Sequence, residues 1–260
     1  MTTTSLLLAA SVMTAVSTIA AGDFVTVDLS SQINSDLRTY FNGTNYPTGG
    51  QILAFAGVPM ALGLKNGNPS SLGAVQIPNG TQPTTFSFVL DVAAPIRLYT
   101  LINSAWGSFG ANNGKVEVFG TNGAYASMSL VQGTNIRDHY QGSYQNLLSD
   151  PTVVPTLYLG GVRLDRQVLE LPPSFAGQTV TELRFSGVGA NPAGAAFLAG
   201  ATFEVAAPCL GDLNGDAAVD ANDLAILLGA WGTVDADLDG DGTTGATDLA
   251  IVLGAWGACP

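Results

Sequence analysis

Aspartate residues near the carboxyl end of the chain recur at a spacing that suits the binding of a cation. The segment 212–232 aligns with the segment 237–257 at an offset of 25 residues, and 14 of the 21 aligned positions are identical. Calcium binds roughly six to eight oxygen atoms, and a loop of about twelve residues supplies them from positions 1, 3, 5, 7, 9 and 12. Four carboxylates fall at these positions in each repeat, where they would repel one another without a cation.

The ligand positions of the two loops are assigned residue by residue. In the first loop they are Asp212, Asn214, Asp216, Ala218 (through its carbonyl), Asp220 and Asp223. In the second loop they are Asp237, Asp239, Asp241, Thr243 (through its carbonyl), Gly245 (through a water molecule) and Asp248. Magnesium is disfavoured because it requires a tighter octahedral shell with fewer protein oxygens. The sequence therefore predicts two calcium ions, and the alternative is an acidic, solvated linker.

A short amphipathic helix is predicted after each loop, which a solvated linker would not require. The apolar positions at helical spacing are Leu224, Leu227, Leu228 and Trp231 in the first repeat and Leu249, Val252, Leu253 and Trp256 in the second. A helix of about two turns is unstable alone, so we expect the two helices to pack together and bury both tryptophan side chains. Contact with a partner is the alternative role for these tryptophans.

The first residues of the chain have the pattern of an export signal. Residues 6–21 are apolar or small, and Ala20, Ala21 and Gly22 offer a cleavage site. A membrane anchor is the alternative, but the stretch is short for a span and contains several Ser and Thr residues. We therefore expect a signal peptide at 1–21, a protein that is secreted or held at the cell surface, and no membrane span after cleavage.

Two cysteines, Cys209 and Cys259, flank the pair of repeats. In an exported protein, cysteines placed in this way predict one disulfide bond that closes the module. In the chain-entropy description, a closed loop of this length stabilises the folded module by roughly 4 kcal/mol.

The carboxyl-terminal repeats resemble the type I dockerin family. The resemblance covers 209–260 and rests on two calcium loop–helix segments, each with an Asp-x-Asn/Asp-x-Asp pattern and a closing Asp. It implies a module that docks onto a cohesin domain in the assembly of polysaccharide-degrading complexes. The family recognises its partner largely through loop positions 10 and 11, which here are Ala221-Asn222 and Ala246-Thr247 instead of a Ser/Thr pair. Attachment to a cell-surface component and a purely structural role therefore remain open beside cohesin binding.

The negative charge of the chain is concentrated in this tail. The chain contains 20 acidic and 8 basic residues, and the segment 209–260 holds nine of the acids and no Lys or Arg. No basic surface is available to neutralise phosphates, which disfavours nucleic acid as a partner.

The rest of the chain is predicted to be a β-sandwich, with the jelly roll as the expected topology. Turn signals, including Asn-Gly at 42, 79, 113 and 122, separate short β-prone runs, and no long stretch has helical periodicity. The predicted strands are 24–29, 86–92, 96–102, 115–119, 156–159, 166–171, 179–185 and 201–205. The expected fold is therefore mostly β: a sandwich domain at 22–205, a short linker at 206–208 and a small all-α calcium-binding domain at 209–260.

Two segments of the expected sandwich contain side chains suited to sugars. Trp106 follows a predicted strand, and Arg137, Asp138, His139 and Tyr140 lie together in a loop. Aromatic faces contact the CH faces of sugar rings, and polar side chains bond to their hydroxyl groups. The alternative is that Arg137 and Asp138 form a structural ion pair and that Trp106 is a core residue.

Three functional hypotheses follow. The strand pattern of 24–205 and these loops weakly resemble the galactose-binding-like jelly rolls of carbohydrate-binding modules, which implies polysaccharide as a ligand. The leading hypothesis is a secreted, non-catalytic protein in polysaccharide catabolism, in which the calcium module docks a carbohydrate-binding sandwich to a partner or surface. One alternative is a secreted glycoside hydrolase or polysaccharide lyase, for which two facing carboxylates are needed. The other is a cell-surface structural or adhesion protein.

Overall fold

The architecture is described from a computed structural model. The structure describes residues 23–78, 83–142, 146–187, 194–206, 209–216 and 218–259, without the side chains of 157–159. The expected signal peptide lies outside these residues, as do the Asn79-Gly80 turn signal and the last two residues of the expected linker. Within the described ranges, no helix has the length and apolar character needed to cross a membrane.

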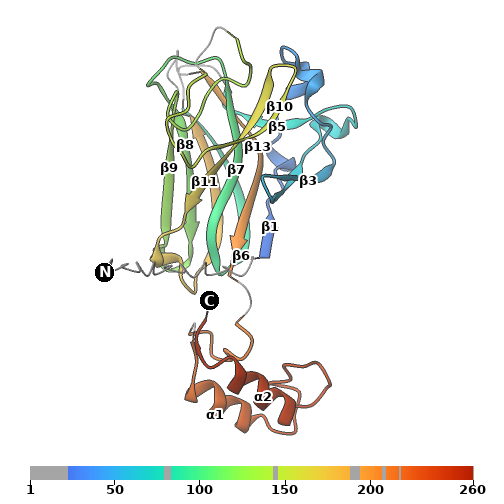
Figure 1. Ribbon diagram of the computed structural model, residues 1–260, viewed down its shortest axis with the longest axis vertical. Helices are drawn as coiled ribbons and strands as arrows, with labels where there is room; N and C mark the ends of the chain where they lie inside the picture. Colours follow the sequence, from blue (N-terminus) through green and yellow to red (C-terminus); the bar gives the residue numbers. More distant parts are fainter. Residues whose placement is uncertain are drawn as a thin grey trace, which may run out of the picture.

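Most of the described chain before residue 206 folds into antiparallel β-sheets (Figure 1). The larger sheet has the strand order β10-β11-β7-β13-β5-β2, with β1 also paired to β13. Its strands are β1 (Asp23–Thr26), β2 (Ser35–Asp36), β5 (Gly73–Gln76), β7 (Pro95–Ala105), β10 (Val154–Leu159), β11 (Val162–Glu170) and β13 (Ala195–Val205). The smaller sheet, of order β6-β12-β8-β9, contains β6 (Thr84–Ala93), β8 (Asn112–Gly120), β9 (Tyr125–Val131) and β12 (Thr179–Gly187).

Shorter elements connect and cover these sheets. Strands β3 (Gln51–Phe55) and β4 (Val58–Leu62) form a hairpin. Short 3₁₀ helices lie at Ser30–Gln32, Leu37–Thr39, Gly43–Asn45, Lys65–Gly67, Thr121–Gly123 and Pro173–Phe175.

The main hydrophobic core lies between the two sheets, as expected of a β-sandwich. Phe88, Val116 and Leu183 of the smaller sheet are buried in one cluster with Ile102 and Leu198 of the larger sheet. Sheets with alternating inward and outward side chains bury one face each in this way. The mostly β fold expected from the sequence is therefore present.

A second core covers the opposite face of the larger sheet. Met60 of the β3–β4 hairpin is buried against Leu101 and Phe197 of the sheet. Strand β13 therefore has cores on both faces, which explains why ten of its residues, from Ala195 to Glu204, are buried. A strand buried on both faces has a continuous run of apolar or small residues instead of an alternating one.

Each of the eight predicted strands corresponds to a strand of the structure, whereas β2, β3, β4, β5 and β9 were not predicted. One turn signal was also wrong, because Asn113-Gly114 lies within β8 and not in a turn. The register with β9 shifts at this point, and the backbone of Gly114 has a φ of 139°. A Cβ atom on Gly114 would come within 1.9 Å of the Ser186 carbonyl oxygen, so this position requires glycine.

The carboxyl-terminal segment contains two helices of nine residues, α1 (Ala221–Gly229) and α2 (Ala246–Gly254). Strands β14 (Ala218–Val219) and β15 (Gly257–Ala258) pair with each other, so the expectation of an all-α segment at 209–260 was wrong in this detail. The predicted disulfide bond between Cys209 and Cys259 is present. Figure 1 shows α1 and α2 side by side, and their buried contact is made by Leu227 and Val252.

The expectation that Trp231 and Trp256 are buried together is wrong. Their exposed fractions are 48% and 49%. Each helix ends before its tryptophan, at Gly229 and at Gly254, so the tryptophans lie beyond the apolar stripe that the helical spacing assumed. Both side chains are therefore available for contact outside the segment.

Candidate functional site

The candidate binding site begins where two neighbouring strands of the larger sheet separate. Strands β7 and β11 pair from Arg97 opposite Glu170 to Leu101 opposite Arg166. Beyond this point the segment 136–140 lies between them. Ser104 of β7 donates its N–H to the Arg137 carbonyl at 2.9 Å and accepts the His139 N–H at 2.8 Å, while Arg163 of β11 donates its N–H to the His139 carbonyl at 2.9 Å.

Buried side-chain amides replace the ladder hydrogen bonds that are lost at this separation. Gln167 accepts the Ile102 N–H at 3.1 Å and donates to the Ile102 carbonyl at 2.7 Å, so its side chain acts like the backbone of an adjacent strand. Asn103 accepts the Asp165 N–H at 2.8 Å in the same way. Unpaired buried backbone groups cost free energy, so these two amides allow the strands to separate without that cost.

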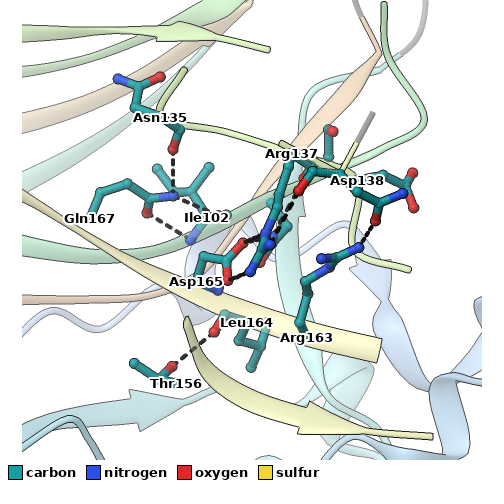
Figure 2. A network of polar contacts seen from close by, with 12 residues as sticks. Ile102, Asn135, Arg137, Asp138, Thr156, Arg163, Leu164, Asp165 and Gln167 are labelled. Carbon is teal, nitrogen blue, oxygen red and sulfur yellow. Dashed lines mark hydrogen bonds and ion pairs between the residues drawn. The ribbon is translucent and has the colours of Figure 1, made fainter. Parts of the chain in front are cut away.

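The guanidinium group of Arg137 is directed to the sheet and not to the pocket described below. It donates to both carboxylate oxygens of Asp165, at 2.7 and 2.8 Å, and also to the Asn146 carbonyl at 3.2 Å (Figure 2). The Asp165 side chain is fully buried. The structural ion pair considered from the sequence therefore exists with a different partner, Asp165 in place of Asp138.

Asp138 holds two aromatic residues in place through their backbones. Its carboxylate accepts the N–H of Trp106 on one oxygen and the N–H of Tyr140, at 2.7 Å, on the other. The residue is 2% exposed, and burial raises the pKa of its carboxyl group, which the two backbone hydrogen bonds partly oppose. A single buried carboxylate thus positions the chain at both tryptophan and tyrosine.

Trp106 has a backbone conformation that bulky residues rarely adopt. Its φ is 55°, in the left-handed region, and its N–H is bound by Asp138. The side chain is 37% exposed, so it is not the core residue that the sequence left as an alternative. Strained conformations of this kind persist where surrounding contacts determine them, and they concentrate at binding sites.

These contacts build a pocket of about 660 Å³ on the sandwich. Its walls are mainly aromatic and its polar groups few; the lining residues are Tyr40, Phe41, Gln76, Ala105, Trp106, Asp138, His139, Tyr140 and Gly142. The Phe41 and Tyr140 rings meet edge to face with centroids 4.6 Å apart. A Cβ atom at Gly161 would lie 2.6 Å from the Tyr140 ring, so only glycine at this position leaves room for the ring.

His139 is an uncharged residue of this pocket near neutral pH. Burial, assisted by the positive charge of Arg163, lowers the pKa of His139 from 6.5 to about 4. Its Nδ1 atom lies 3.0 Å from the Tyr46 hydroxyl, which also lies 3.2 Å from the Arg163 carbonyl oxygen. Nδ1 is therefore engaged by Tyr46, and Nε2 is the second nitrogen of an uncharged ring, which accepts or donates one hydrogen bond according to the tautomer.

The structure brings together four of the five sandwich residues that the sequence indicated. Trp106, Asp138, His139 and Tyr140 line the pocket, and Arg137 supports it from behind. The contributions of Tyr40, Phe41 and Gln76 were missed, because no local pattern shows that these positions meet the segment 136–140, which lies far along the chain from each of them. Asn103 did give a signal, as an amide directly after the apolar residues Leu101 and Ile102, whereas Gln167 lies in a strand with several charged residues and did not.

The acidic loops of the carboxyl-terminal segment form a second candidate site. Carboxylate oxygens of Asp237, Asp239 and Asp248 lie within 4.8 Å of one another. Asp248 is buried, and its oxygens accept the N–H groups of Gly245, Leu238 and Asp239, which hold the pKa of its carboxyl group below the usual value. Hard cations such as calcium bind oxygen ligands, so the clustered carboxylate oxygens of the second loop fit the calcium ion predicted from the sequence.

The first loop is arranged differently. Asp223 occupies the place of Asp248 and accepts the N–H groups of Leu213 and Asp220. However, the Asn214 amide donates to Asp216 at 2.9 Å, and Asp220 accepts the Asn222 N–H at the start of α1. Among the described residues, the second loop holds the one compact group made of carboxylates alone.

Comparison of the chain with protein-family models and with curated proteins finds no match in either case.

The buried pair Arg137–Asp165 predicts a large stability loss on single substitution. Asp165→Asn leaves the Arg137 guanidinium without its counter-charge, and we expect the free energy of unfolding in urea to fall by about 3–5 kcal/mol. The matched control is Glu182→Gln, because Glu182 pairs with Arg184 on the surface and such pairs contribute less than about 1 kcal/mol. Similar losses for the two variants would contradict this assignment.

The lowered pKa of His139 predicts an acid-dependent loss of stability with a defined pH range. Between pH 6.5 and about 4 the unfolded chain binds a proton that the folded chain does not, so stability falls as pH falls through this range and His139 causes no further loss below it. The total loss of unfolding free energy over this pH range is at most about 3 kcal/mol. Urea unfolding at several pH values should show a shallower decline for His139→Gln. Parallel curves for the two proteins would show that His139 titrates normally.

Proposed function

We propose that this protein is an exported, non-catalytic glycan-binding protein. The pocket of the sandwich binds a polysaccharide, and the carboxyl-terminal module, loaded with two calcium ions, attaches the sandwich to a partner or surface. The observation that supports glycan binding is the set of aromatic walls around few hydrogen-bonding groups, a combination suited to sugar rings.

The carboxylates that line the pocket help to distinguish glycan binding from glycoside hydrolysis. A glycoside hydrolase requires a pair of carboxylates about 5–10 Å apart across the substrate. The described lining of this pocket contains one carboxylate, Asp138, and both of its oxygens accept backbone hydrogen bonds. The contacts of Asp138 therefore favour a binding role for the pocket over an acid–base role.

The charge of the tail supports the calcium proposal. The segment 209–260 contains nine Asp and no Lys or Arg, so no side chain within it can neutralise the loops. In the sandwich, by contrast, the buried carboxylate of Asp165 is matched by Arg137. A bound divalent cation would supply the missing positive charge in each loop and connect its two ends.

The exposed apolar residues of the tail support a docking role. Leu228 and Trp231 in the first repeat correspond to Leu253 and Trp256 in the second, and all four are about half exposed. Exposed apolar groups repeated in this way favour contact with another surface. The partner proposed from the family resemblance is a cohesin-like domain, and a cell-surface component is the other candidate.

Calcium titration tests the tail. By isothermal titration calorimetry we expect the full chain to bind two calcium ions, and Asp216→Ala and Asp241→Ala each to remove one binding event. At about a hundredfold excess over Kd, each bound calcium ion should stabilise the tail by about 2.7 kcal/mol. Asp235→Asn is the control, because it removes an exposed carboxylate outside both loops. Absence of binding, or a melting curve that a chelator leaves unchanged, would refute the calcium proposal.

Binding to immobilised polysaccharides tests the pocket. We expect the full chain to be retained and Trp106→Ala to bind about tenfold more weakly, because an aromatic wall is lost. Phe109→Ala is the matched control: Phe109 is also an exposed aromatic residue of this loop, but it does not line the pocket. Equal retention of both variants would place any glycan contact elsewhere, and no retention of the unaltered chain would contradict glycan binding.

A further inference from the structure

The charges around the pocket define the class of sugar that it can take. Among the residues that the structure describes, its lining contains one carboxylate, Asp138, one histidine, His139, and no Lys or Arg. Both oxygens of Asp138 accept N–H groups, from Trp106 and Tyr140, so part of the acceptor capacity of the carboxylate is used within the protein. The positive charge of Arg163 acts on both Asp138 and His139 and offsets the negative charge of the carboxylate, so the pocket has no excess charge to attract an ionic ligand.

The cationic side chains near the pocket are directed elsewhere. Arg137 is bound by both oxygens of Asp165. Arg38, two residues before Tyr40, donates to the Tyr46 carbonyl, and Arg163 is buried and donates to the Asn146 side chain. A carboxylate or sulfate on a ligand would therefore lose its hydration without gaining a counter-charge from the described lining.

The groups that remain suit hydroxyls. His139 offers Nε2 to a hydroxyl group, because its other ring nitrogen, Nδ1, is engaged by the Tyr46 hydroxyl; a hydroxyl can donate to Nε2 or accept from it, whichever tautomer is present. The Gln76 side-chain amide, which also lines the pocket, both donates and accepts. These neutral partners lie among rings whose faces pack against the CH groups of a sugar.

We propose that the pocket selects an uncharged sugar ring over uronic acid or sulfated sugars, with aromatic walls against the ring and His139 Nε2 and Gln76 bonded to its hydroxyl groups. This inference rests on the proposed function, because it names the ligand class of the same pocket. The selectivity arises because both oxygens of Asp138 already accept backbone N–H groups and because Arg137 is already paired with Asp165.

The experiment compares sugars that differ in a single group. Oligogalactosides, oligogalacturonates and fully methyl-esterified oligogalacturonates of equal length are titrated into the calcium-loaded full chain at pH 7, alongside matched gluco- and glucurono-oligosaccharides. We expect at least one uncharged sugar to bind, its acid counterpart to bind at least tenfold more weakly, and methyl esterification to recover the lost affinity. Gln76→Ala and Phe41→Ala should weaken binding of the uncharged sugar, whereas Phe109→Ala should not.

The outcomes separate this inference from the proposed function. If an acidic sugar binds as well as or better than its uncharged counterpart, the pocket is a glycan site but the proposed selectivity is wrong. If no sugar of either class binds, glycan binding itself is wrong. Tetramethylammonium serves as a cationic probe, and its displacement of a bound uncharged sugar would also overturn the selectivity, because the carboxylate behind the rings would then be recruiting a cation.

Discussion

The separation of β7 from β11 is the constraint on which the binding face of the sandwich depends. Two neighbouring strands of a buried sheet part only where other groups take over their backbone hydrogen bonds. Here Gln167 and Asn103 provide substitute donors and acceptors, and the segment 136–140 completes the pairing. The same segment presents His139 and Tyr140 to the pocket, so the polar groups that allow the strands to part also create the binding surface.

Carboxylates accept backbone N–H groups in both parts of the protein, but the two parts differ in how the negative charge of these carboxylates is neutralised. In the sandwich, Asp165 is paired with Arg137, and Asp138 is stabilised by two N–H groups. In the tail, Asp223 and Asp248 likewise accept backbone N–H groups, yet the surrounding carboxylates have no basic side chain to neutralise them. The contrast shows why a cation is proposed for the tail and an uncharged ligand for the pocket.

The sequence predicted what depends on local spacing. The positions of the two short helices and of eight strands followed from patterns within a few residues of one another. The disulfide bond followed from two cysteines that flank the repeats, 50 residues apart. The helical spacing failed at Trp231 and Trp256 because the helices end two residues earlier, at Gly229 and Gly254. Spacing identifies which residues would share a face, but it does not show how far a helix continues.

Features that depend on distant contacts were not predictable in this way. Strands β3 and β4 are short and are stabilised by packing against the second face of β13. Arg137 could not be assigned to Asp165 from its neighbours, since Asp138 is adjacent in sequence and equally charged. Likewise, Phe41 and Gln76 reach the pocket only because the larger sheet and its covering segments bring them to Trp106.

The most direct test of this account is to locate a bound sugar on the protein. Amide and indole resonances of the calcium-loaded chain are followed by ¹H–¹⁵N NMR while an uncharged oligosaccharide is added. The account predicts that the shifts concentrate at Trp106, His139 and Tyr140, while α1 and α2 are unaffected. Shifts centred instead on the outer face of the smaller sheet, around Phe119 and Tyr125, would contradict it.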